Sequence, residues 1–188
     1  MPRPHSSRTL DLPCLDPPGT SRTLVIPFAF SRERPSYQQM FDNVHSTDPF
    51  TTLPRVLIPS LRYTYVPPRM LYGWPAPKES LLAYAKKKKI VVRSGRTIDE
   101  PATLGIALRI MMLESGVANL PHDMLRPRIT PVGADDQQRV VVAVYSNYDF
   151  TRKELPSQET MEKLGQCLGV EGPPRWYLDG LNWYWRLW

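Results

Sequence analysis

The clearest hydrophobic periodicity lies in the second half of the chain, where three segments are typical of helices. Residues 78–88 are mostly strong helix formers, and residues 100–115 carry apolar side chains around nearly the whole helix circumference. A third segment begins after Ser157, a favourable N-cap, and ends at Leu168, just before Gly169. The pattern predicts three helices, of which the one at 100–115 is central and buried and the others flank it.

Strand patterns are strongest at residues 139–145, whose sequence RVVVAVY is almost continuously apolar. Such a run is typical of an interior strand covered on both faces, and residues 129–132 are placed to pair with it. Two upstream runs contain proline, and the first, at 23–30, is therefore an edge strand at most. In the second, at 55–66, Leu61, Tyr63 and Tyr65 alternate with polar residues, which predicts a half-buried strand. The sequence YGWP at 72–75 predicts a turn.

The last fourteen residues, RWYLDGLNWYWRLW, contain four of the five tryptophans. Asp179-Gly180 favours a hairpin turn of type I′, since both central residues of that turn need positive φ. The predicted pairs are Leu178 with Leu181, Trp176 with Trp183, and Arg175 with Tyr184. Because side chains alternate along a strand, one face carries Trp176, Leu178, Leu181, Trp183, Trp185 and Leu187. The other face carries Arg175, Tyr177, Asn182, Tyr184, Arg186 and Trp188.

These elements predict a single α+β domain at residues 78–188, with a mainly antiparallel sheet, a central buried helix, flanking helices and a C-terminal tryptophan-rich hairpin. Residues 23–77 are rich in proline but also in large apolar side chains, so we expect an extended arm that packs on the domain. Residues 1–22 contain few core-forming side chains and predict a disordered or loosely draped tail.

Composition narrows the class of protein. The chain has 188 residues, 21 prolines and two cysteines, which are far apart at Cys14 and Cys167. Two distant cysteines do not indicate a disulfide framework, which favours a reducing compartment. No apolar run approaches the roughly 20 residues that cross a bilayer. We therefore expect an intracellular protein, cytoplasmic or nuclear, with no membrane partner.

The positive charge is concentrated in a short central stretch. The net charge is +6 at pH 7, and residues 78–109 hold eight basic and three acidic side chains, a net charge of +5. The candidate polyanion-binding residues are Lys86, Lys87, Lys88, Lys89, Arg93 and Arg96. The alternative is a solvated helix end, where lysines interact favourably with the helix dipole.

The C-terminal hairpin is a second candidate surface. Its partner-binding residues would be Arg175, Tyr177, Trp183, Tyr184, Trp185, Arg186 and Trp188. Tryptophan is enriched at interface hot spots, and aromatic rings beside guanidinium groups can stack on bases and contact phosphates. The alternative is that the tryptophan face completes the core of the domain, because aromatic residues build cores more often than binding sites.

Catalytic and metal-binding patterns are weak. No two histidines or cysteines have the spacing of zinc ligands, and we expect neither a metal nor a cofactor. A small enzyme or ligand-binding domain is the alternative to a pure binding protein. Its pocket would lie near Tyr145, Asn147 and Tyr148, at the end of the strongest strand, together with His122.

The sequence thus favours a non-enzymatic binding protein. Its partner would be a protein or a nucleic acid, recognised through the basic stretch and the aromatic hairpin. A further alternative is an obligate oligomer or complex subunit whose tryptophan face is the interface, since large apolar patches are rarely left exposed.

Overall fold

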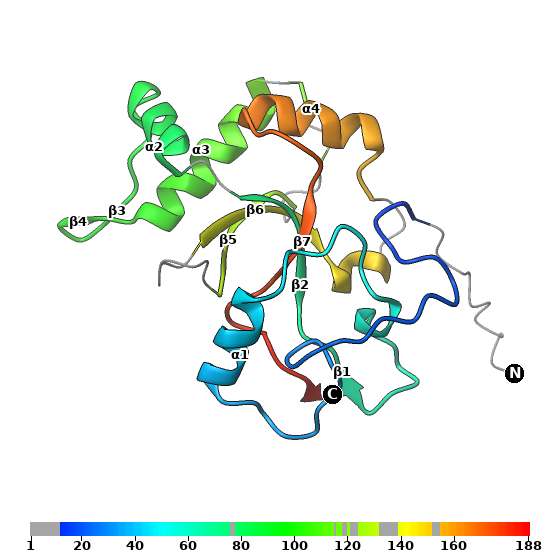
Figure 1. Cartoon of the computed structure of the whole chain (residues 1–188). Coiled ribbons are helices and arrows are strands. Elements are labelled where there is room, and N and C mark those ends of the chain that lie inside the picture. The colour runs from blue at the N-terminus through cyan, green and yellow to red at the C-terminus, as the bar shows by residue number, and fades with distance from the viewer. Residues whose placement is uncertain are drawn as a thin grey trace, which may run out of the picture.

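The structure of the chain is a computed structural model that describes residues 12–75, 78–114, 116, 117, 120, 124–131, 139–151 and 155–188. Its largest sheet has four antiparallel strands, in the order β5 (Arg126–Thr130), β6 (Arg139–Ser146), β2 (Met70–Pro75) and β7 (Arg175–Leu178). The helices α2 (Lys78–Lys87), α3 (Glu100–Glu114) and α4 (Gln158–Leu168) gather at the top of Figure 1. Helix α1 (Tyr37–His45) lies near the C-terminal segment (Figure 1). The fold is α+β, as the sequence predicts.

Two short ladders flank the main sheet. Strand β1 (Tyr65–Val66) pairs with β8 (Arg186–Leu187), and β3 (Arg93–Ser94) pairs with β4 (Thr97–Ile98) in a small hairpin that projects beyond α3 (Figure 1). Two 3-10 turns complete the described elements: η1 (Arg55–Leu57) and η2 (Asn147–Thr151).

The helices form where the sequence predicts them. Helix α4 has the predicted caps: the Ser157 hydroxyl accepts the Thr160 N–H, and Gly169 ends the helix with φ of 63°. Helix α3 buries one face, which includes Leu104 and Leu108, whereas Ile106 and Leu113 are 43% and 55% exposed. Apolar side chains around the whole circumference therefore do not place this helix at the centre of the core.

The predicted turn at 72–75 is wrong, because these residues form part of β2, an interior strand of the main sheet. Glycine and proline normally interrupt strands, but here Gly73 is required by a close approach between strands. A Cβ atom on Gly73 would lie 1.9 Å from the Val142 carbonyl oxygen, beside a register shift between Tyr72 and Gly73. The proline ends the strand and is exposed.

The predicted C-terminal hairpin does not form. Strand β7 pairs with β2 instead, and the chain then continues to β8, which pairs with β1. The buried Asp179 carboxylate gives the reason: its Oδ1 accepts the backbone N–H groups of Leu181 and Asn182, both at 2.8 Å. This side-chain turn competes with a two-residue hairpin turn and directs the following residues away from β7.

The upstream segments also differ from the expected strands. Residues 23–30 form turns, with a cis peptide bond between Ile26 and Pro27. In the run at 55–66 only the last two residues belong to a strand, and Leu61 is 89% exposed rather than half-buried. Proline at both positions limits backbone pairing more strongly than the apolar pattern favours it.

Part of the first 22 residues belongs to the core. Residues 1–11 lie outside the described residues, but Cys14, Leu15 and Asp16 are buried, and Leu15 forms a parallel bridge with Leu53. The Trp176 indole donates a hydrogen bond of 2.9 Å to the Cys14 carbonyl oxygen. The N-terminal segment thus contacts the last strand of the main sheet.

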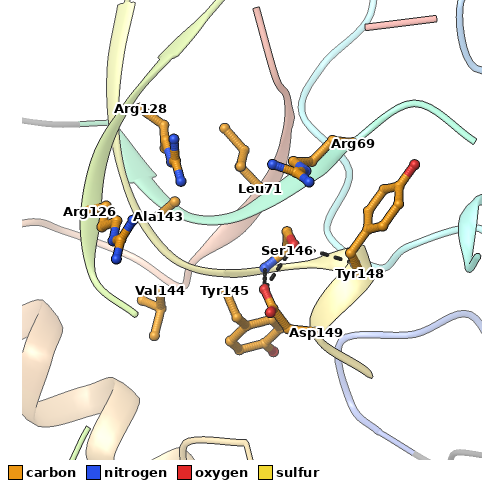
Figure 2. Close-up of a pocket in the computed structure, with 10 residues that line it drawn as sticks. All are labelled: Arg69, Leu71, Arg126, Arg128, Ala143, Val144, Tyr145, Ser146, Tyr148 and Asp149. Atoms are coloured by element: carbon orange, nitrogen blue, oxygen red, sulfur yellow. Dashed lines mark hydrogen bonds between the residues drawn. The ribbon is translucent and has the colours of Figure 1, made fainter. Parts of the chain in front are cut away.

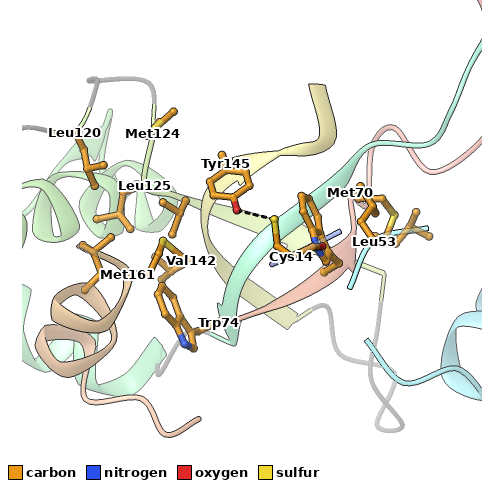
Figure 3. Close-up of a cluster of buried hydrophobic side chains, with 14 of the residues drawn as sticks. Cys14, Leu53, Met70, Trp74, Leu120, Met124, Leu125, Val142, Tyr145 and Met161 are labelled. Carbon is orange, nitrogen blue, oxygen red and sulfur yellow. Dashed lines mark hydrogen bonds between the residues drawn. The ribbon is translucent and has the colours of Figure 1, made fainter. Parts of the chain in front are cut away.

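The core lies on one face of the main sheet, where helices α3 and α4 and non-helical segments from both ends of the chain pack on the strands. Trp176 is completely buried, and its ring contacts the rings of Tyr72, Tyr145 and Phe150. The Tyr145 hydroxyl donates to the Cys14 thiol at 3.3 Å (Figure 3). Burial raises the pKa of the Cys14 thiol and raises the pKa of Tyr145 strongly, so both groups stay neutral in the folded protein.

Candidate anion-binding site

The face of the sheet opposite this core carries arginine side chains. Arg126 and Arg128 are two residues apart on the edge strand β5, so both point to the same face. Arg126 lies opposite Ala143 of β6, which in turn lies opposite Gly73 of β2. Strand pairing thus places the two arginines beside the central strands, on the side away from the helices.

A pocket of about 180 Å³ opens on this face. Its lining residues are Arg69, Leu71, Arg126, Arg128, Ala143, Val144, Tyr145, Ser146, Tyr148 and Asp149, and we call it the arginine pocket (Figure 2). Figure 2 shows the guanidinium groups of Arg126 and Arg128 on one side and that of Arg69 on the other. The volume is below the roughly 300 Å³ of a typical small-molecule site, so it suits one group of a larger ligand.

Arg69 is held in place by backbone and ring contacts. Its backbone N–H donates to the Asn182 carbonyl oxygen at 2.8 Å, and its backbone carbonyl oxygen accepts the Asp179 backbone N–H at 2.9 Å. Its guanidinium carbon lies 5.0 Å from the centre of the Tyr148 ring, within the range of a cation–π interaction. Its Nε is buried and has no hydrogen-bond partner among the described residues. A buried donor without a partner is uncommon in folded proteins.

The acidic side chain in the arginine pocket belongs to the local turn. One carboxylate oxygen of Asp149 accepts both the N–H and the hydroxyl of Ser146, each at 2.8 Å. These bonds fix the start of η2, where β6 ends. Three arginines and one aspartate line the pocket, which leaves it with a net positive charge. Guanidinium groups present planar pairs of donors that match the oxygens of phosphate and carboxylate groups.

The basic stretch predicted from the sequence lies elsewhere. Lys86, Lys87, Lys88 and Lys89 are exposed at the end of α2, and Arg93 and Arg96 are exposed on the β3–β4 hairpin. The Lys88 ammonium donates to Glu114 at 2.5 Å, and the Tyr84 hydroxyl donates to the other oxygen of that carboxylate at 2.8 Å. The Lys88 hydrogen bond lowers the pKa of Glu114. None of these six basic residues lines the arginine pocket.

The residues of the predicted aromatic surface do not form one surface, because some are buried in the core and the others lie in several separate places. Trp183 and Trp185 are buried, and Tyr184 stacks against Arg34, whose guanidinium carbon is 4.4 Å from the ring centre. Arg186 donates to the Asn182 side chain at 2.9 Å, and Trp188 is exposed and donates to the Tyr63 carbonyl at 2.7 Å. Arg175 and Tyr177 lie on β7, opposite Gly73 and Leu71, on the face of the sheet that carries the arginine pocket.

Part of the predicted small-molecule pocket coincides with the arginine pocket, since Tyr145 and Tyr148 line it. Asn147 has a structural role instead. Its Oδ1 accepts the Met70 N–H at 2.8 Å, and its Nδ2 donates to the carbonyls of Leu57 and Pro68 at 2.6 and 2.9 Å. His122 lies outside the described residues.

The sequence did not identify Arg69, Arg126 or Arg128 as candidates. The alternation of arginines in RPRIT, at 126–130, is a signal for a shared face, but only once these residues are assigned to a strand. Arg69 follows two prolines and has no local pattern that connects it to β5. These side chains meet only through the pairing of β5, β6 and β2.

The described residues show neither a metal-binding cluster of three or more His, Cys, Asp or Glu side chains nor a helix long and apolar enough to span a bilayer. Comparison of the chain with protein families, curated proteins and solved structures found no match in any of the three. The geometry of the arginine pocket is therefore the main basis for a functional proposal.

Proposed function

We propose that this protein is a non-enzymatic binding protein for an anionic partner, and that a phosphate or carboxylate group of the partner enters the arginine pocket. The observation that carries the proposal is the arrangement of Arg69, Arg126 and Arg128 around one cavity of about 180 Å³. These residues come from two separate parts of the sequence, and the sheet holds them near one point.

The chemistry of the pocket favours binding of an anion. Hydrogen bonds between guanidinium and an anionic oxygen are charge-assisted and about twice as strong as neutral ones. Arg69, Arg126 and Arg128 each bring several N–H donors and a permanent positive charge to the cavity. Leu71 and Ala143 form an apolar floor that excludes water from one side of the ligand, which strengthens these electrostatic interactions.

The basic stretch and the C-terminal residues take supporting roles in this proposal. The exposed lysines at 86–89 attract an anionic partner over a longer range and increase the rate of encounter. Arg175 and Tyr177 extend the positive face across β7 and provide contacts next to the pocket. The partner, a protein or a nucleic acid, is thus recognised by the sheet face rather than by a hairpin.

The test is a titration of the full chain with inorganic phosphate, followed through the arginine Nε–Hε signals in NMR spectra. We expect saturable shifts for Arg69, Arg126 and Arg128. Arg62, an exposed arginine that does not line the pocket, is the internal control and should not shift. Sodium chloride at matched ionic strength separates specific binding from screening. Equal shifts for all arginines, or no saturation, would refute the proposal.

A further inference from the structure

A second pocket lies on the other side of the edge strand β5. It has a volume of about 240 Å³ and is lined by Pro101, Gly105, Arg109, Met112, Met124, Leu125, Arg126, Pro127 and Arg128. Arg126 and Arg128 therefore line both pockets. Arg69 lines only the first pocket, on the sheet face, and Arg109 of α3 lines only the second.

We propose that the surface formed by these two pockets and the shared Arg126 and Arg128, which we call the path, binds a single strand of nucleic acid. A phosphate would lie in the arginine pocket and the neighbouring nucleotide in the second pocket. This inference rests on the anion-binding function proposed above and adds the class of partner. Arg126 and Arg128 line the pocket that would receive the phosphate and also border the second pocket, so the same two residues lie next to both parts of the ligand.

The second pocket differs from the first in its floor. Met112, Met124 and Leu125 are buried side chains, 7%, 4% and 8% exposed, and Gly105 opens the α3 side of the cavity. Arg109 is exposed at its border. An apolar floor with cationic edges fits a flat base and its sugar next to a phosphate. Methionine is well suited to such a floor because its flexible, polarisable side chain adapts to planar ligands.

The aromatic side chains of the sheet face support the same class of partner. Tyr148 lies against Arg69, and Tyr177 is half-buried on β7 beside Arg175 on the same strand. Nonspecific single-strand binding combines a positive groove with aromatic rings on which bases stack. An acidic peptide supplies repeated charge but no flat apolar units. A duplex keeps its bases stacked, so they cannot enter a pocket at the edge of a sheet.

The inference is tested by the dependence of affinity on chain length. A fluorescein-labelled RNA octamer is bound to the full chain and displaced by uridine monophosphate, by uridine oligomers of two, four and eight nucleotides, and by an octaglutamate peptide. We expect the four-nucleotide competitor to bind on the order of tenfold more tightly than the monophosphate, since it adds contacts of the strength expected for a stacked base. DNA oligomers of the same lengths distinguish RNA from single-stranded DNA.

Two variants with a matched control locate the path. Arg109→Gln should weaken binding of the longer oligomers while leaving the monophosphate unchanged, and it should reduce the slope of log affinity against log salt by about 0.7. Arg69→Gln should weaken binding of every length. Arg62→Gln, which alters an exposed arginine that lines neither pocket, should behave as the wild type.

The outcomes separate the two proposals. If affinity is independent of length, if Arg109→Gln has no effect, or if octaglutamate binds more tightly than the RNA octamer, the nucleic-acid inference is refuted. In that case saturable phosphate shifts at Arg69 and Arg128 still support the anion-binding function. If neither phosphate nor any oligomer binds, both proposals fail.

Discussion

The molecule has two basic regions, and they are built in opposite ways. The lysines at 86–89 are consecutive in sequence and exposed at a helix end, where Glu114 pairs with Lys88. The arginine pocket brings Arg69 together with Arg126 and Arg128, which lie more than fifty residues later in the sequence, in one concave site. Water and salt screen the first region, whereas the second is partly desolvated. The proposed function therefore rests on charge that the fold gathers in a cavity and not on charge density along the sequence.

The largest expected effect comes from forcing the strands β2 and β6 apart. The arginine pocket depends on the pairing of these strands, whereas the lysine region does not. In Gly73→Ala the new Cβ would lie 1.9 Å from the Val142 carbonyl oxygen, so β2 and β6 must separate. We expect a loss of about 3 kcal/mol or more in the free energy of unfolding, measured by urea denaturation. Gly105→Ala is the control, because no atom lies within 4 Å of its Cβ position and alanine favours a helix. Equal stability of both variants would contradict the close approach of the strands.

The next effect concerns the segment that positions Arg69. Asn147→Ala removes three hydrogen bonds, to Met70, Leu57 and Pro68, and leaves buried backbone groups without partners. We expect a loss of about 2 to 4 kcal/mol in the free energy of unfolding. At temperatures where the variant is folded, the Arg69 signal should respond less to phosphate than in the wild type. Binding of a polyanion to the lysines at low salt should not change. If the variant lost this binding together with the Arg69 response to phosphate, the two basic regions would not be independent.

A further effect arises from alkaline pH, which acts on the core beneath the sheet. Burial, with a nearby Cys14, raises the pKa of Tyr72 from 10.0 to about 12, and burial also raises the pKa of Tyr145 and of Cys14. The unfolded chain therefore loses protons at lower pH than the folded chain, so the stabilisation is complete below about pH 9 and declines as the pH rises towards 12. The decline should approach about 1.4 kcal/mol per pH unit for each group.

Tyr145→Phe gives the control for this dependence. It removes the hydroxyl that donates to Cys14 and should make the thermal unfolding temperature less sensitive to pH between 9 and 11. A wild-type melting temperature that stays constant over this range would contradict the raised pKa values of these buried groups.

The smallest effect is expected at the lysine end. Glu114→Gln removes the exposed partner of Lys88, and a surface ion pair of this kind contributes little to stability. The melting temperature should change by no more than the experimental error, while binding of a polyanion at low salt should increase slightly. A marked fall in the melting temperature would show that this ion pair stabilises the fold, which would contradict the expectation from its exposure.

The sequence predicted the elements whose signals are local. The capped helix α4, the apolar strand β6 and the helices α2 and α3 lie close to their expected positions. Caps and periodicity depend on neighbouring residues, so a single sequence reports them well.

Elements that depend on distant partners were not predictable. Gly73 permits a close strand approach, but a glycine next to a proline normally indicates a turn. Asp179-Gly180 indicated a hairpin, but the buried Asp179 carboxylate caps a different turn. The arginine pocket could not be predicted from the sequence for the same reason, because only strand pairing brings Arg69 close to β5.

The most direct test compares the two basic regions in one binding assay. The labelled RNA octamer is titrated with the wild type, with Arg128→Gln, and with a variant in which the lysines at 86–89 are all glutamine, at near-physiological salt. We expect the single arginine substitution to weaken binding on the order of tenfold, since it removes a charge-assisted contact in a partly desolvated site. The fourfold lysine substitution should weaken it less, because exposed lysines are screened. The reverse order, with the lysine variant more damaged than Arg128→Gln, would contradict the assignment of binding to the arginine pocket.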